Sequence, residues 1–374
     1  MDTPVPRIPR PPLAPQRYDP FLDRPEADEA ETAQEIAGQM LRIAGTTHAH
    51  SGHAIRSVHA KSHGLLKAEL EVLGDLPEAL AQGLFGTPAR YEALMRFSTT
   101  PGDLLDDKVS TPRGLAIKVL GVPGERLEGS EGASTQDLVM VNGPKFAARS
   151  GKAFLRSLKW VAATTDKAER SKEALSAVLR ATEGFIETIG GKSGALRALG
   201  GEPPTHPLGE TFWAQLPYRH GDYMARFQLV PTSPELLALK GQRLDLGESE
   251  NAIREAMVRH FHRHGGTWEL RVQLCTTIED MPIDDPTAEW SEQDSPFLTV
   301  ARLVAPPQLA WSPARAAAVD DGMGFSPWHG LQAHRPLGAI MRMRKLAYAT
   351  SQRFRSERNA RQVIEPDSLA AVPD

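Results

Sequence analysis

Residues 56–72 read RSVHAKSHGLLKAELEV and join a histidine-rich segment to a strand-like pattern. Apolar residues recur at every second position of its last part, at Leu66, Ala68, Leu70 and Val72, with charged residues between them. Such alternation is typical of a half-buried antiparallel strand, which has one face on a core and the other in solvent. The stretch therefore predicts a strand that begins directly after the histidines.

Seven further segments of similar length carry strand patterns, at 91–98, 114–122, 136–141, 211–218, 223–230, 268–276 and 297–304. With the first strand they make eight, and few helical segments separate them. Eight short strands of this kind favour an antiparallel sheet that closes into a barrel, because closure removes exposed strand edges. The predicted fold class is α+β, built on an eight-stranded antiparallel β-barrel.

Helical patterns accompany the barrel. In the first of them, Ile36, Met40 and Ile43 recur at helical spacing behind an acidic first turn. Pro336 stands where proline is tolerated in a first helical turn, and helix-forming residues follow it to the neighbourhood of residue 359. The predicted helices lie at 27–44, within an insertion at roughly 145–199, at 248–264, and from 336 onward.

The N-terminal residues 1–25 include eight prolines. Proline lacks a backbone donor and disfavours helix in the residue before it, so this segment is predicted to be an extended arm. Two readings stay open: a disordered tail, or an arm that docks on something. No linker divides the remainder, and residues 26–374 are predicted to form a single domain.

The composition and charge of the chain argue against several classes of protein. The chain of 374 residues has a net charge of -4 with both signs interleaved, which does not favour binding to nucleic acid. No apolar run approaches the roughly 20 residues that span a bilayer. Cys275 is the only cysteine, which excludes an intrachain disulfide framework. The first residues lack the pattern of a secretory signal, so a cytoplasmic location is expected.

Three residues of the C-terminal helix, Arg344, Tyr348 and Arg355, fall on nearly one face because they are spaced by four and seven. By spacing alone, the favoured interpretation is a solvated or ion-paired surface stripe. The alternative is chemical, since a tyrosinate is a known axial ligand of haem iron. A guanidinium one turn back would favour that charged form of the phenol, and Arg355 could reach a haem propionate.

The segment before the first strand contains five histidines within sixteen residues, His48, His50, His53, His59 and His63. His59 and His63 could share a zinc ion if they lay on a helix. That interpretation is weak because no acidic or cysteine ligand occurs among them. The first three histidines are expected to be solvated loop residues.

Several short motifs occur together in one order. They are RSVHAK (56–61), RFST (96–99), PRG (112–114), DLV (137–139) and RKLAY (344–348). In this order they resemble the haem catalase family, over roughly residues 45–360. Further stretches resemble the short catalase-related peroxidases in particular: FWAQLPYR (212–219), GDY (221–223), FSPW (325–328) and HRPLG (334–338).

The resemblance implies a haem b cofactor in a barrel of catalase type, with His59 on its distal side. There His59 would move the peroxide proton from one oxygen to the other, as a general acid–base group. Ser98 would hydrogen-bond that histidine and fix its tautomer. Val58 is expected to line the distal pocket, and Phe154 matches an aromatic residue that packs near the haem.

On the other side of the haem, the resemblance implies that Tyr348 is the axial ligand of the iron and Arg344 its hydrogen-bonding partner. Three arginines match those that pair with haem propionates, for which a planar guanidinium is well suited. They are Arg56, Arg96 and Arg355.

The sequence also departs from the catalase pattern. Catalases place an asparagine in the distal pocket, whereas an ungapped alignment puts Val141 there, with Asn142 one residue late. In a strand, an offset of one residue turns the side chain to the opposite face. A more apolar pocket would favour bulkier hydroperoxides over hydrogen peroxide.

The resemblance therefore implies a peroxidase that reduces hydrogen peroxide or organic hydroperoxides through a ferryl intermediate, with a small organic molecule as the reducing donor. Three alternatives remain: a catalase that dismutates hydrogen peroxide, an enzyme that rearranges hydroperoxides, or a non-catalytic haem-binding protein. Compared with full catalases, the chain lacks the C-terminal helical extension and has a short arm. We therefore expect a shorter access channel, and a homodimer rather than an interlocked tetramer.

Overall fold

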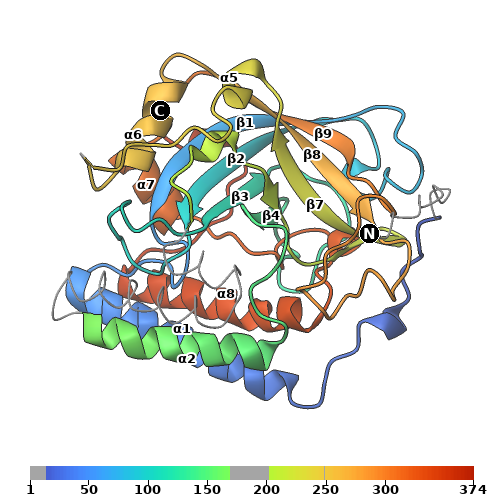
Figure 1. Cartoon of the computed structure of the whole chain (residues 1–374), viewed down its shortest axis with the longest axis horizontal. Coiled ribbons are helices and arrows are strands. Elements are labelled where there is room, and N and C mark those ends of the chain that lie inside the picture. The colour runs from blue at the N-terminus through green and yellow to red at the C-terminus, as the bar shows by residue number, and fades with distance from the viewer. Residues whose placement is uncertain (1–13, 169–201, 248) are drawn as a thin grey trace, which may run out of the picture.

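The computed structural model describes residues 14–168, 202–247 and 249–374. One antiparallel sheet dominates them (Figure 1). Its nine strands are β1 (Ser62–Val72), β2 (Arg90–Thr99), β3 (Arg113–Val119), β4 (Gln136–Val141), β5 (Phe212–Trp213), β6 (Tyr218–His220), β7 (Tyr223–Pro231), β8 (Gly266–Leu274) and β9 (Leu298–Ala305).

The sheet closes on itself through β5, which pairs with β4 on one side and with β7 on the other. The closed ring is β1-β2-β3-β4-β5-β7-β8-β9, and β6 adds to β7 outside it. Eight strands form the ring, so the predicted eight-stranded antiparallel barrel is confirmed. The single strand predicted at 211–218 is wrong in detail, since the structure has two short strands there. Pro217 lies between them and cannot donate a ladder hydrogen bond.

The alternation read in the first strand is confirmed in β1. Leu66, Ala68, Leu70 and Val72 are buried in the main hydrophobic core. Aromatic side chains from other strands fill the same core, including Phe97, Phe212, Phe227 and Trp268. The barrel is therefore filled by its own side chains, and a ligand has to bind outside it.

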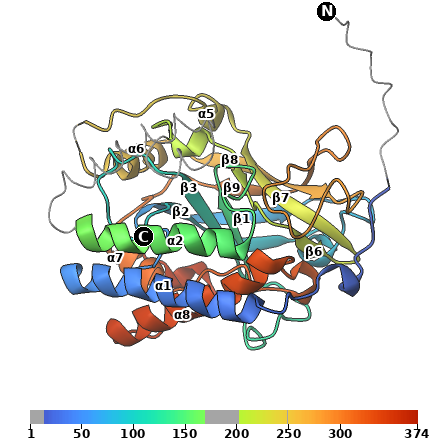
Figure 2. The same ribbon diagram turned by 60° about the horizontal axis from the view of Figure 1, so that its bottom comes forward.

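Three long helices form a layer against one side of the barrel: α1 (Glu29–Ser51), α2 (Gly151–Ala168) and α8 (Ala339–Arg358). Figure 2 shows the three side by side below the strands. Shorter helices are α5 (Pro234–Leu237), α6 (Ala252–Phe261) and α7 (Pro313–Ala316). The predicted helical insertion is present as α2 up to residue 168, and the rest of that prediction lies outside the described residues. No described helix is long and apolar enough to cross a lipid bilayer.

Two predicted helix boundaries are wrong. α1 continues to Ser51, so His48 and His50 are helical residues and not part of a loop. α8 begins at Ala339 instead of near Pro336, because Pro336 forms a bridge to Tyr218 and Gly338 then adopts a φ of 88°. A side chain at Gly338 would also collide with the backbone oxygen of Ile283.

The described part of the N-terminal arm, residues 14–25, runs along the barrel (Figure 1). The Gln16 amide donates to the Cys275 carbonyl at 2.8 Å, and the Tyr18 amide donates to the Asp222 carbonyl at 2.7 Å. Arg17 forms an ion pair with Asp222 at 2.8 Å. The two interpretations of the arm were a disordered tail and a docked arm. Residues 14–25 are docked, and the surface that they contact is the barrel of the same chain.

Candidate active site

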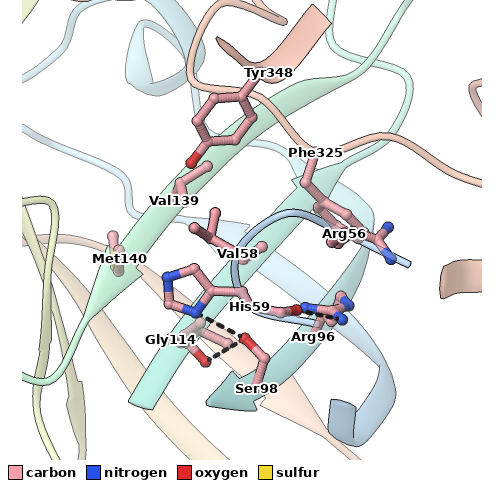
Figure 3. Close-up of a pocket in the computed structure, with 12 residues that line it drawn as sticks. Arg56, Val58, His59, Arg96, Ser98, Gly114, Val139, Met140, Phe325 and Tyr348 are labelled. Carbon is pink, nitrogen blue, oxygen red and sulfur yellow. Dashed lines mark hydrogen bonds between the residues drawn. The ribbon is translucent and has the colours of Figure 1, made fainter. Parts of the chain in front are cut away.

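A cavity lies between the barrel and α8, and the side chains of His59 and Tyr348 both line it (Figure 3). It encloses about 390 Å³ and opens to solvent. A second space of about 440 Å³ continues from it along α8, past Ser351 and Arg355. Both spaces share Tyr348 among their lining residues, so they form one site.

His59 has a strained backbone. Its φ is 53°, in the left-handed region that residues with a side chain rarely adopt. Hydrogen bonds hold it there: its amide donates to the Thr100 carbonyl at 2.8 Å, and its carbonyl accepts from Arg96 Nη2 at 2.8 Å. The next amide, of Ala60, donates to the Pro101 carbonyl at 3.0 Å. This conformation directs the imidazole back toward the barrel.

The imidazole of His59 lies flat against β3. Its Nδ1 is 3.2 Å from Ser98 Oγ, and that oxygen is 3.5 Å from the Gly114 carbonyl (Figure 3). A Cβ at Gly114 would overlap the ring, so only glycine leaves room for it. Burial lowers the pKa of His59 to about 3, and the charges of Arg96, Arg344 and Arg56 act in the same direction. His59 is therefore neutral at physiological pH.

The three arginines expected to hold propionates do converge, and the residue on which they meet is Asp320. Arg96 Nε donates to Asp320 Oδ1 at 2.7 Å, and Arg56 Nη1 lies 3.2 Å from the same oxygen. Arg355 Nη1 donates to the Asp320 carbonyl at 2.5 Å, and Arg56 Nη1 to that carbonyl at 2.7 Å. Asp320 is not among the site residues predicted from the sequence. It follows no recognisable motif, and its only sequence signal is an acidic pair shortly before FSPW.

Asp320 lies in a π-helical turn, Ala317–Asp321, which follows α7. Burial acts to raise the pKa of its carboxyl, but the charges of Arg96 and Arg56 outweigh it, and hydrogen bonds from Ser62 and Arg96 add to them. The pKa of Asp320 is therefore lower than usual, and the group is ionised. Because burial is the largest influence on Arg355, its pKa is lowered to about 10.

Tyr348 projects from α8 with its hydroxyl directed into the cavity (Figure 3). Arg344, one turn earlier, does not form a hydrogen bond with it among the described residues. Its Nη1 lies 3.8 Å from Met341 Sδ, and its Cζ lies 5.4 Å from the centre of the Phe146 ring. Phe154 packs on that ring at 5.5 Å and is not among the residues that line the cavity. Arg344 and Phe154 therefore both lie in the helix layer.

Two of the three residues considered for the distal pocket are not brought to the cavity. Val58 and Val139 line it, whereas Val141 does not. The Asn142 amide is held in another place, where its Oδ1 accepts from the Arg113 amide at 2.9 Å and its Nδ2 donates to Glu210 at 2.9 Å. Asn142 therefore belongs to a buried cluster of charged residues at the end of β4.

His59 and His63 do not converge on a common point. His63 is buried, and its Nε2 lies 3.2 Å from Thr99 Oγ1. His53 is exposed and pairs with Asp321 at 2.9 Å. In the described part of the chain, no group of three or more histidine, cysteine or acidic side chains is arranged to hold a metal ion.

A closed eight-stranded barrel, with a helix layer and a cavity between the two, defines the catalase fold. The chain matches a fungal catalase with a TM-score of 0.56 and 18% identity, over 95% of this chain and 69% of that one. It matches a bacterial catalase with a TM-score of 0.52 and 18% identity, over 82% and 58%. It matches catalase A from Saccharomyces cerevisiae with a TM-score of 0.56 and 16% identity, over 97% and 72%.

No family model and no curated protein matches this sequence. At identities of 16 to 18% the likeness to catalases establishes the fold. Activity has to be inferred from the residues of the site.

Proposed function

We propose that this protein is a haem b-dependent peroxidase, which reduces hydroperoxides with electrons from a small organic donor. The observation that carries the proposal is that His59 and Tyr348 line one cavity between the barrel and α8, with three buried arginines beside it. The catalase fold supports this proposal, and so do the sequence motifs that contain these residues.

The residues present fit haem b. Arg56, Arg96 and Arg355 bring three positive charges; Arg56 and Arg96 hydrogen-bond the Asp320 carboxylate, and Arg355 hydrogen-bonds the Asp320 carbonyl. The Nε of Arg355 is buried and has no hydrogen-bond partner among the residues that the structure describes. An unpaired buried N–H is costly, and a bound carboxylate would satisfy it. The two propionates of haem b supply charge of the required sign.

In this proposal Tyr348 would hold the haem iron through its phenolate oxygen. When bound, haem supplies the redox-active iron on which a hydroperoxide is reduced. The Arg344 charge lies close enough to lower the pKa of His59, so a positive field extends across the cavity.

His59 carries the proton. In one tautomer, Nδ1–H donates to Ser98 Oγ while the Ser98 hydroxyl is directed at the Gly114 carbonyl. Nε2 is then the free base on the other side of the ring. It takes the proton from one hydroperoxide oxygen and returns it to the other oxygen as the O–O bond breaks.

The lining favours organic hydroperoxides over hydrogen peroxide. Val58, Val139 and Phe325 present apolar surface to the cavity. The Asn142 amide, which would help to position hydrogen peroxide, is held by Arg113 and Glu210. A hydroperoxide with an apolar substituent gains from burial against such side chains, whereas hydrogen peroxide does not.

The test is turnover of hydrogen peroxide and of cumene hydroperoxide, each with and without guaiacol as donor, on haem-reconstituted protein. A peroxidase consumes both only with the donor and prefers cumene hydroperoxide. Oxygen release from hydrogen peroxide without donor would show a catalase instead. Loss of cumene hydroperoxide with no donor oxidised would show rearrangement.

Two variants separate binding from chemistry in that experiment. His59→Ala should retain haem and lose turnover by about 100-fold or more, the usual contribution of a general acid–base group. Tyr348→Phe should lose or loosen the haem. Full turnover in His59→Ala would refute its role as proton carrier. A wild-type protein that takes up no haem would refute the proposed function as a whole.

A further inference from the structure

Asp320 is the shared hydrogen-bond acceptor of the three arginines beside the cavity. Its Oδ1 receives Arg96 and Arg56, and its backbone carbonyl receives Arg56 and Arg355. The remaining oxygen, Oδ2, accepts from Ser62 Oγ at 2.6 Å, and that hydroxyl in turn accepts from Trp311 Nε1 at 3.0 Å. Both carboxylate oxygens and the carbonyl of Asp320 therefore have partners, and its orientation is fixed.

Each arginine is oriented by its hydrogen bonds to Asp320, and each has N–H groups that these bonds do not use. Arg96 Nε is bound to Asp320, and its Nη2 is bound to the carbonyls of His59 and Ala60. Its Nη1 has no recorded partner within 14–168, 202–247 or 249–374. Arg355 uses Nη1 alone for Asp320, and its Nε is buried without a partner. The cluster is pre-formed, and it is incomplete.

The cluster has an excess of positive charge. The three guanidinium groups hydrogen-bond to Asp320, whereas the neighbouring Asp321 pairs with His53 at 2.9 Å and acts on Arg56 and Arg355 through its charge. Burial and the other two arginines both lower the pKa of Arg56, which reflects repulsion among like charges. Three cations outnumber the two carboxylates, so an anionic ligand would complete the cluster.

We infer that Asp320 is a positioning residue, which gathers Arg56, Arg96 and Arg355 into a pre-formed site for the two carboxylates of the cofactor. The inference rests on the proposed haem-binding function, which it deepens. Without the Asp320 carboxylate, Arg56 and Arg96 would lose the acceptor that they share, and the three guanidinium groups would repel one another. Pre-organisation of this kind lowers the free-energy cost of ordering the site when the ligand binds.

The test compares binding of haemin and of haemin dimethyl ester, both delivered in the same detergent and followed by visible absorption. The ester lacks the carboxylates but keeps the iron and the ring. Asp320→Asn should weaken haemin by about 10- to 100-fold, the usual cost of losing a group that orients a ligand. Binding of the ester should be unchanged, because the effect acts through the carboxylates.

Asp321→Asn is the matched control. It removes the adjacent carboxylate of the same turn, which hydrogen-bonds His53 and acts on Arg56 and Arg355 only through its charge. It should not weaken haemin binding, because it breaks no hydrogen bond to the arginines. If Asp320→Asn bound haemin as tightly as the wild type, or more tightly, Asp320 would be inert or a competitor of the propionates, and the inference would be overturned.

Ser62→Ala carries the test if Asp320→Asn does not fold. It removes the hydrogen bond that fixes Asp320 Oδ2, together with the one that Ser62 Oγ accepts from Trp311 Nε1. It should weaken haemin in the same direction by a smaller factor, and unchanged binding would overturn the inference. If the wild-type protein bound neither haemin nor its ester, the proposed function would fail, an outcome distinct from equal binding by wild type and variant.

Discussion

His59 combines an unfavourable backbone with a tightly fixed ring. A non-glycine residue with positive φ costs of the order of 1–3 kcal/mol, so the surrounding structure has to hold it. Three hydrogen bonds from its own and the next peptide do so, and one of them comes from Arg96. Arg96 also binds Asp320, so the arginine cluster and His59 are connected through one residue. The strain at His59 is therefore coupled to the cluster that we propose holds the propionates.

Gly114→Ala tests whether the position of the imidazole matters. The new Cβ would overlap the ring of His59, which has to move away from Ser98. We expect hydroperoxide turnover by the haem-loaded protein to fall by about 10-fold or more, because misplacing a catalytic group by 1 Å can cost 100-fold. Thermal unfolding of the protein and its haem content should change little.

Gly38→Ala is the control for that experiment. Gly38 is exposed on α1, and a Cβ there would meet nothing within 4 Å. It should leave turnover unchanged and slightly stabilise the helix. If Gly114→Ala kept the turnover of Gly38→Ala, the close approach of His59 to β3 would have no catalytic role.

The helix that carries Tyr348 is anchored at its N-terminus by residues from other segments. Gly338 offers no capping side chain, and its amide donates instead to Asp23 Oδ1 at 2.9 Å. The next amide, of Ala339, donates to Asp284 Oδ1 at 2.8 Å. Arg342 binds both Asp23, from the N-terminal arm, and Glu29, from α1. Negative groups stabilise a helix N-terminus, so the arm helps to fix the direction of α8.

Asp23→Ala tests this anchor. It leaves the Gly338 amide without its partner and removes one of the two carboxylates that bind Arg342. Because these groups are buried, we expect unfolding in urea to show a loss of about 1–3 kcal/mol. Asp19→Ala is the matched control on the same arm, since Asp19 accepts only an exposed local hydrogen bond. Equal losses in the two variants would show that the arm does not anchor α8.

Strand periodicity predicted most of the barrel because burial alternates along each strand, as Leu66 to Val72 show. It did not predict how the barrel closes, since β5 is a strand of two residues, Phe212–Trp213, whose pairing depends on both neighbours. Asp320 could not be predicted either. Its role arises only where side chains from β2, α8 and the segment before β1 converge, and no local pattern records that convergence.

On the scale of the whole molecule, burial holds many histidines neutral. Seven of them have a lowered pKa, with burial as the largest cause in each: His59, His63, His206, His220, His260, His329 and His334. The value is about 4 for His206, His220 and His329 and about 3 for His59 and His334. These histidines lie in the barrel, in its loops and in the candidate site, so their protonation at low pH destabilises the entire fold.

The sign of the effect follows from linkage. The unfolded chain binds protons at these histidines below about pH 6.5, while the folded chain does not until near pH 4. The free energy of unfolding therefore falls as pH falls through this window, by up to about 1.4 kcal/mol per pH unit for each histidine. Three acids oppose the trend, because burial raises their pKa: Asp107, Asp137 and Glu210. For Asp137 the Glu365 charge adds to burial and Lys118 acts against it, and its pKa is about 7. The seven histidines outnumber these acids.

We therefore expect cooperative acid unfolding near about pH 5, since a typical stability of roughly 5–15 kcal/mol is exhausted within one or two pH units. Urea unfolding at several pH values between 7.5 and 5 measures the slope on protein without added haem. His334→Gln should reduce that slope by about one proton, because His334 is buried among Phe85, Phe227 and His220. His262→Gln, on the surface, should leave the slope as it is. A stability that stayed constant down to pH 5 would show that these histidines do not control the response of the fold to acid.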